Sequence, residues 1–413
     1  MKEKIVVIGG GPAGIIASAT ASKKGANVIL IEKNERIGKK MLITGNGRCN
    51  ITNLCSIEEL IDNVTRNNYF LYSAFYSFTN KDIIDILDQY GLKVKVEDNN
   101  RCFPITNKSI DVTNVLERYL LDNNVDISLN TKVYKINKKD DKFIIDYIKN
   151  DKNHTIKADK LIISTGGKSY PATGSTGDGY DFAKKLGHNI VSLIPSMVPF
   201  NIKEDWIKEI KGISLTEVKI SLIHNKKEVD NEIGDIIFTH YGISGPSVFN
   251  LSCRKNRTIE QNNNIKLRLD FFPHLNEKEF DDKLLGLLQY NSNKNIINII
   301  DNLIPYALGL NILKRLNIEY NLKANQLNKE NRKGIVSILK ELELSISGLR
   351  SIKEAYVTSG GVDTREINPS TMESDIVKGL YFCGEILDVD AYTGGFNLQI
   401  AYSTGYLAGE SCC

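Results

Sequence analysis

Three glycines and one acid near the start of the chain have the spacing of a dinucleotide-binding site. The apolar run 5–8 leads into Gly9, Gly11 and Gly14, and Glu32 follows a second apolar run, 18 residues after Gly14. Gly9 permits a sharp turn, Gly11 leaves room for a pyrophosphate, and Gly14 lets the next helix pack closely on the strand. Because Glu32 can accept hydrogen bonds from ribose hydroxyls and would repel a 2′-phosphate, FAD or NAD is favoured over NADP.

Three side chains elsewhere could move a proton at neutral pH. His240 and Tyr241 lie in the glycine-rich stretch FTHYGISGP, and Tyr170 lies in a second glycine-rich stretch, 164–180. Histidine is the side chain best suited to general acid–base work near neutrality, so His240 and Tyr241 are the leading candidates and Tyr170 is the weaker one. The competing interpretation is that His240 only hydrogen-bonds a backbone carbonyl and holds the turn.

The seven cysteines do not have the spacing of a metal site, so no metal ion is expected. They are Cys49, Cys55, Cys102, Cys253, Cys383, Cys412 and Cys413. Cys49 and Cys55 are separated by five residues rather than the four typical of flavin-dependent disulfide reductases. The set is best interpreted as free thiols in a reducing compartment.

The elements that position these residues begin with strand, turn, helix and strand over residues 4–33, the order of a βαβ unit. The loop 38–53 is rich in glycine and small polar residues, which suits a segment laid along an extended ligand, and its Arg48 could pair with a phosphate. The alternative interpretation is an ordinary surface loop. We expect a helical pattern over 57–90 and a helix over 111–123.

The central part of the chain is expected to return to the same cofactor. Strands over 125–129, 132–137 and 142–148 resemble the β-meander of flavoproteins, in which the backbone near Val133 would contact adenine. The strand 158–167 ends in Thr-Gly-Gly, and a helix follows over 178–186, which Asp178 or Thr176 could cap. Because no second βαβ glycine motif supplies a nicotinamide unit, a tightly bound FAD is favoured over a dissociating NAD.

The composition shifts near residue 195 and indicates further domains, as expected for 413 residues. We assign residues 1–194 and 357–413 to an α/β nucleotide-binding domain of the Rossmann type, with a mixed or parallel sheet and a β-meander. Residues 195–274 and 341–356 form a β-rich substrate or cap domain, and 275–340 a small helical insertion. The strand 379–384 and the glycines 394–395 lead into a last helix, whose N-terminus could face the flavin where negative charge gathers on reduction.

The overall composition indicates an ordinary globular protein, with 41% hydrophobic residues and a formal net charge of +3. So small a net charge predicts no nucleic-acid partner. No stretch approaches the roughly 20 apolar residues of a membrane span, so no membrane partner and a cytoplasmic location are expected. The oligomeric state is left open.

Five separated motifs together resemble the YhiN/BaiN-like flavoproteins, also labelled aminoacetone-oxidase-like or NAD(P)/FAD-dependent oxidoreductases. The motifs are GGGPAG, TGNGRCNITN, ISTGGKSYPATGSTGDGY, FTHYGISGPS and GLYFCGEILDVDAYTGGFNLQIAYSTG, and they span the whole chain. The resemblance implies an FAD domain built from both ends of the chain, an inserted barrel-like domain and a helical piece. Asn46 stands where many relatives have glycine.

The glycine motif and the resemblance together give the expected FAD contacts. They are Gly9, Gly11, Pro12, Ala13, Gly14, Glu32, Lys33, Lys40, Gly47, Arg48, Cys49, Asn50, Val133, Thr165, Gly166, Gly384, Glu385, Gly395, Asn397 and Leu398. Among them, Glu385 is expected to reach the ribitol or a hydroxyl next to a phosphate.

The expected function is an FAD-dependent oxidoreductase that passes a hydride between flavin N5 and a small organic substrate of the amine or conjugated-enone class. NADH or NADPH would bind transiently as reductant. Two alternatives stay open: a non-catalytic redox sensor acting through Cys49 or the pair Cys412–Cys413, and an RNA-modifying flavoprotein of the methyl-transfer type. The near-zero net charge counts against the second.

Overall fold

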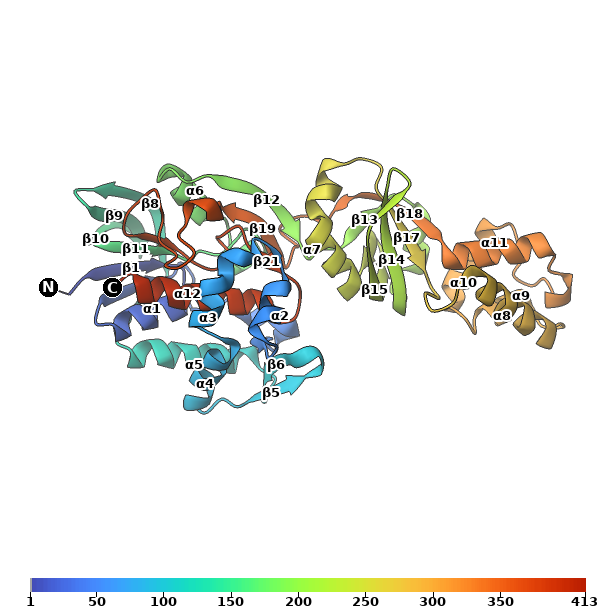
Figure 1. Ribbon diagram of the computed structural model, residues 1–413, viewed down its shortest axis with the longest axis horizontal. Coiled ribbons are helices and arrows are strands. Elements are labelled where there is room, and N and C mark those ends of the chain that lie inside the picture. Colours follow the sequence, from blue (N-terminus) through green and yellow to red (C-terminus); the bar gives the residue numbers. More distant parts are fainter. Residues whose placement is uncertain (1) are drawn as a thin grey trace. The chain divides into compact units, whose positions relative to one another are not determined.

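The computed structural model describes residues 2–413, which divide into two compact units (Figure 1). The first unit contains residues up to 196 and from 351 to the end, and the second contains 197–350. Both ends of the chain therefore build one unit, and the second is inserted into it. No helix within residues 2–413 combines the length and apolar composition needed to cross a bilayer.

The first unit is built around a five-stranded parallel sheet with the order β20-β11-β1-β2-β7. The strands are β1 (Lys4–Ile8), β2 (Asn27–Ile31), β7 (Asp126–Ser128), β11 (Lys160–Ile163) and β20 (Leu380–Phe382). The central strands are continuous apolar runs because both faces of the sheet are covered. The chain order reverses beside β1, which places a topological switch point at the carboxyl ends of β1, β2 and β11.

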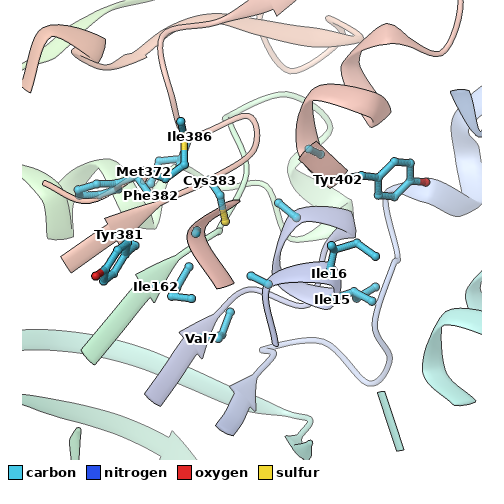
Figure 2. Packing of buried hydrophobic residues seen from close by; sticks show 14 of the residues in the cluster. Val7, Ile15, Ile16, Ile162, Met372, Tyr381, Phe382, Cys383, Ile386 and Tyr402 are labelled. Carbon is cyan, nitrogen blue, oxygen red and sulfur yellow. The ribbon is translucent and has the colours of Figure 1, made fainter. Parts of the chain in front are cut away.

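Helices α1 (Pro12–Lys23) and α12 (Phe396–Ser411) lie side by side on one face of this sheet (Figure 1). They approach so closely that a Cβ on Gly405 would lie 2.3 Å from the carbonyl oxygen of Ala13, and one on Gly409 would lie 2.4 Å from that of Ala17. Residue numbers increase in the same direction on both helices from the pair Ala13–Gly405 to the pair Ala17–Gly409, so the helices run parallel. Figure 2 shows the buried side chains around α1, among them Val7, Ile162 and Tyr402.

The opposite face of the parallel sheet carries the antiparallel meander β8 (Thr131–Lys139), β9 (Lys142–Lys149) and β10 (Lys152–Ala158) (Figure 1). The expectation that 125–129 is a meander strand was wrong, because β7 pairs with β2 in the parallel sheet. The third meander strand is β10.

The remaining elements of the first unit surround these layers. They are β3 (Thr52–Asn53), α2 (Ile57–Asp62), β4 (Val64–Arg66), α3 (Tyr72–Ser77), α4 (Asn80–Gln89), β5 (Val94–Glu97), β6 (Arg101–Pro104), α5 (Ser109–Asp122), α6 (Asp178–Lys185), β12 (Ile190–Ser196), β19 (Val357–Val362) and β21 (Asp390–Ala391). The helical pattern expected over 57–90 is interrupted, because β4 pairs with β21. Gly177 occupies the N-cap of α6 without a side-chain cap, so the predicted caps from Asp178 and Thr176 were wrong.

The second unit contains a closed six-stranded barrel and a group of helices, so the expected fold class is confirmed. The barrel strands are β13 (Phe200–Ile202), β14 (Ser214–His224), β15 (Lys227–Thr239), β16 (Gly242–Ser244), β17 (Lys266–Asp270) and β18 (Leu342–Leu349). The helices are α7 (Pro246–Gln261), α8 (Glu277–Tyr290), α9 (Ile296–Ile300), α10 (Tyr306–Arg315) and α11 (Lys329–Lys340). Helix α7 lies within the segment expected to be β-rich.

A buried histidine in the first unit makes its stability depend on pH. His188 is 3% exposed, with Nδ1 2.9 Å from Glu366 Oε2 and Nε2 2.8 Å from Ser374 Oγ. Burial lowers the pKa of His188 below 6.5, although Glu366 opposes that shift. The neutral imidazole therefore stabilises the fold above the unfolded pKa, and this contribution is lost as the pH falls through the folded pKa.

We expect the melting temperature to fall as the pH is lowered from 7 to 5, and His188→Gln to remove part of that fall. A single such group contributes at most about 1.4 kcal/mol per pH unit while it is protonated only in the unfolded chain. Thermal melts of both proteins at each pH measure the difference. Parallel curves for the two proteins would show that His188 does not titrate on unfolding.

Candidate functional site

The glycine turn after β1 packs against protein atoms on one side and has free space on the other. A Cβ on Gly9 would lie 2.5 Å from Ser164 O, and one on Gly14 would lie 2.0 Å from Gly9 O. A Cβ on Gly11 would have no atom within 4 Å. Helix α1 begins at Pro12 without a side-chain cap, so its first N–H groups are available to an anion. The turn is thus a cradle for a phosphate group.

Glu32 connects the end of β2 to this turn. Its Oε2 accepts from Gly10 N at 2.7 Å, and its Oε1 accepts from Asn34 N at 2.8 Å and Asn34 Nδ2 at 2.7 Å. The neighbouring Lys33 donates to Thr176 Oγ1 at 2.5 Å and Asp178 Oδ2 at 2.7 Å. The carboxylate holds the turn in place, and its contact with ribose remains a prediction.

The N-terminus of helix α12 lies beyond that of α1, measured along the direction that the two parallel helices share. Helix α12 begins after Gly395, which has φ 101° and no side-chain cap. Gly405 lies level with Ala13 near the start of α1, and it is nine residues beyond the start of α12. Ala13 is itself one residue beyond the start of α1, so at 1.5 Å per residue the N-terminus of α12 projects roughly 12 Å past that of α1. The two positive helix ends suit an extended ligand with a phosphate at one end and a charge-accepting ring at the other.

Two predicted contact residues carry buried polar atoms that have no protein partner. They are Asn50 Oδ1, in the loop after β2, and Thr165 Oγ1, in the loop after β11. A Cβ on Gly179 would lie 2.0 Å from Thr165 Oγ1, so the hydroxyl is also closely packed. Buried polar atoms are nearly always hydrogen-bonded, and an extended polar cofactor would supply the missing partners. The residues present therefore fit FAD.

Lys40 and Glu385 form an ion pair in this region, with Lys40 Nζ 2.8 Å from Glu385 Oε2. Glu385 Oε1 also accepts from Ser169 Oγ at 3.1 Å and from Thr358 N at 2.9 Å. Lys40 and Glu385 were each predicted from the sequence as cofactor contacts, but their pairing was not predicted, and neither Ser169 nor Thr358 was. No local sequence signal connects residues so far apart in the chain.

Arg48 has a carboxylate partner within the protein, and the neighbouring Cys49 is buried. Arg48 Nη1 lies 2.9 and 3.1 Å from the two carboxylate oxygens of Glu97, and the guanidinium lies 4.0 Å from the Phe103 ring centroid. Cys49 is fully buried, and burial raises its pKa to about 12. A thiol in this environment stays protonated and unreactive, which argues against a sensor role for Cys49.

The other expected contacts lie on nearby elements of the same unit. Val133 is buried on β8, an edge strand of the meander, so one side of its backbone faces away from the sheet ladder. Gly166, Gly384 and Gly47 have positive φ values of 73°, 77° and 81°. The positions of these residues relative to FAD remain predictions.

Asn397 and Leu398 lie in the first turn of α12. Asn397 Nδ2 donates to Ala391 O at 2.8 Å and to Tyr392 O at 3.2 Å, and its Oδ1 accepts from Ala391 N at 3.0 Å. Asn397 therefore fixes the loop that precedes the helix, and Leu398 is partly buried against the core.

The three proton-transfer candidates are divided between the two units. Tyr170, in the first unit, has φ 50° and its ring lies 5.9 Å from that of Tyr356. Burial raises the pKa of Tyr170, so its phenol stays protonated at neutral pH. The left-handed backbone is strained for a tyrosine, and such strain is concentrated at functional sites.

His240 and Tyr241, in the second unit, form the turn between β15 and β16. Their rings are 4.7 Å apart, and the Arg350 guanidinium lies 4.3 Å from the Tyr241 ring centroid. Tyr241 O accepts from Ile202 N at 3.0 Å. This group lies at the end of the barrel where the chain enters and leaves the unit. Arg350 was not found from the sequence.

Comparison with known proteins gives a family match over nearly the whole chain. The model described as HI0933-like protein Rossmann domain matches residues 3–411. A 3-dehydro-bile acid delta(4,6)-reductase of Clostridium scindens is 29% identical over 99% of this chain and 98% of its own length. A ribosomal RNA dihydrouridine synthase of Escherichia coli is 29% identical over 98% of this chain and 96% of its own length.

Solved structures share the fold at low identity. A 3-ketosteroid-delta4-(5alpha)-dehydrogenase from Rhodococcus jostii is 12% identical, with a TM-score of 0.54 over 100% of this chain and 96% of that chain. The open conformation of a flavocytochrome c3 fumarate reductase is 15% identical, with a TM-score of 0.52 over 100% of this chain and 78% of that chain. At these identities the likeness concerns the fold.

Proposed function

The chain belongs to the HI0933-like Rossmann family and is an FAD-dependent oxidoreductase, and we propose that it reduces a carbon–carbon double bond conjugated to a carbonyl. The observation that carries this proposal is a chemical feature common to two relatives that match almost the whole chain. A 3-dehydro-bile acid with Δ4,6 double bonds has alkenes conjugated to its C3 ketone. Dihydrouridine is uridine whose C5=C6 bond, conjugated to the C4 carbonyl, has been reduced.

Bound FAD would supply the hydride in this reaction. The residues expected to hold it are those of the glycine turn, the uncapped ends of α1 and α12, and the unpartnered Asn50 and Thr165. A hydride added to the β-carbon leaves negative charge toward the carbonyl, and a protein acid then delivers a proton to the α-carbon. Tyr170, His240 and Tyr241 are the proposed sources of that proton.

The preferred substrate is a small conjugated enone, and the second candidate is a uracil base within RNA. Two relatives favour the second, because the dihydrouridine synthases of Escherichia coli and Haemophilus influenzae are each 29% identical over 96% of their own lengths. Both substrates require the same addition of a hydride and a proton. None of the three relatives described is named for amine oxidation. The buried thiol of Cys49 does not favour a sensor.

Anaerobic stopped-flow measurements test the proposal. We expect NADH or NADPH to bleach the bound flavin, and a conjugated enone or a uracil-containing RNA to restore its colour faster than buffer alone. Mass spectrometry should show a gain of two hydrogens in the substrate that restores the colour. Whether the enone or the RNA gains them identifies the substrate class. A flavin that is reduced but is then reoxidised by neither substrate class would contradict the proposed reaction.

A further inference from the structure

Two adjacent thiols, Cys412 and Cys413, follow helix α12 and lie against helix α1 (Figure 1, where C marks this end of the chain). Cys412 is 1% exposed, and its Sγ donates to Gly409 O at 3.4 Å. Cys413 Sγ lies 3.7 Å from the same oxygen and 3.5 Å from Ala21 O in α1. Both sulfur atoms therefore lie beside one carbonyl group, at the ends of α1 and α12 that point away from the expected cofactor.

Exposure distinguishes Cys413 from the other cysteines of the chain. Within residues 2–413 it is the one exposed cysteine, and the other six are buried or half-buried. Oxidation of cysteine is selective for accessible thiols with thiolate character, and redox-active cysteines often have a second, resolving cysteine beside them. Cys413 and the buried Cys412 have this arrangement of one accessible and one adjacent thiol.

The surroundings of Cys413 favour its thiolate form. A hydrogen bond from the Cys412 thiol lowers the pKa of Cys413 below its ordinary value, an effect that outweighs the opposing partial burial, and Lys24 contributes in the same direction. In contrast, burial raises the pKa of the half-buried Cys55 to about 11. Because the thiolate is the nucleophile, Cys413 is expected to react faster than Cys55.

A disulfide between adjacent cysteines is easily reduced. Consecutive Cα atoms are about 3.8 Å apart, whereas the Cα atoms of ordinary disulfides are about 4.4–6.8 Å apart. The bond between Cys412 and Cys413 would therefore be strained, and strained disulfides have the higher reduction potentials of labile and regulatory ones. The alternative is a pair of thiols that only pack against α1 and stay reduced.

We propose that Cys412 and Cys413 form a reversible oxidation site, in which hydrogen peroxide converts the two thiols into a disulfide. The Cys413 thiolate attacks the peroxide, whose O–O bond breaks to leave a sulfenic acid on Cys413 and a hydroxide ion, which takes up a proton. The Cys412 sulfur then attacks the Cys413 sulfur, the S–O bond breaks, and a second water leaves. The two thiols are thus oxidised by two electrons while the peroxide is reduced to two waters.

The test is mass spectrometry of the FAD-loaded protein treated with hydrogen peroxide. We expect the wild type to lose two hydrogens within residues 412–413 and to regain them with dithiothreitol, and fragmentation of the peptide 379–413 separates this pair from the fully buried Cys383. Cys412→Ser should stop at the sulfenic acid, which dimedone traps on Cys413, and Cys413→Ser should block both products. Cys55→Ser is the matched control and should lose two hydrogens as the wild type does.

Alkylation of the untreated wild type supplies a measurement that does not depend on the folding of any variant. Iodoacetamide at pH 7 should modify Cys413 about tenfold faster than Cys55, because the larger thiolate fraction outweighs the lower nucleophilicity of a thiol with a lower pKa. Faster modification of Cys55 would overturn the proposal. So would a pair that peroxide leaves unchanged, or one that it oxidises only to acids that dithiothreitol does not reduce. Neither result would bear on FAD binding or on the proposed reaction, because the pair lies away from the expected cofactor.

Discussion

Gly11→Ala is expected to leave the fold intact and to weaken FAD binding on the order of 100-fold. The new methyl group would have no protein atom within 4 Å, and φ of −80° at this position is open to alanine. In the complex it would occupy space that the pyrophosphate needs, and overpacking of this kind costs about 1–3 kcal/mol, or roughly ten- to hundred-fold in affinity. The measurements are FAD titration of the apo-protein and a thermal melt without FAD.

Gly14→Ala is the matched control, because it adds the same methyl group on the protein side of the turn. That methyl group would lie 2.0 Å from Gly9 O and 2.5 Å from Ser164 Oγ, so the backbone must move. We expect Gly14→Ala to lower the melting temperature as well as FAD affinity. If Gly11→Ala folds and binds FAD as tightly as the wild type, the pyrophosphate does not lie at this turn.

The sequence permitted a better prediction of the first βαβ unit than of any other part. Its strands are buried on both faces and therefore apolar throughout, and its turn needs glycine at positions that can be stated in advance. Helix α7 was missed because its buried face includes Ser247, Ser252 and Asn256, so a search for apolar periodicity finds too few matches. Strand β4 was assigned to a helix because its partner, β21, is distant in sequence.

In the candidate site too, residues within a short motif could be predicted from the sequence, whereas contacts between distant segments could not. Gly9, Gly11 and Gly14 could be predicted because a short motif carries their whole geometric requirement. The partners of Arg48 and Glu385 could not, because Glu97 and Lys40 reach them only through tertiary folding. Single-residue chemistry suggested a phosphate for Arg48 and ribitol for Glu385, whereas the structure gives each an ion-pair partner within the protein.

Loss of the proton donor should separate the two halves of the reaction. We expect Tyr170→Phe to slow reoxidation of the flavin by a conjugated enone about 100-fold, within the range for removal of a general acid. Flavin reduction by NADH or NADPH should remain near the wild-type rate, because that half transfers a hydride and does not use the phenol. Stopped-flow absorbance records both halves on the same protein.

The pH dependence identifies the donor independently of the substitutions. Burial raises the pKa of Tyr170 above its ordinary value near 10, so a phenol donor keeps its proton and the reoxidation rate should be flat from pH 6 to 9. A rate that instead changes with pH over this range would show that the Tyr170 phenol is not the donor. In that case His240→Gln, and not Tyr170→Phe, should show the hundred-fold loss. Tyr241→Phe then tests whether the neighbouring phenol, whose ring lies 4.7 Å from that of His240, acts with it.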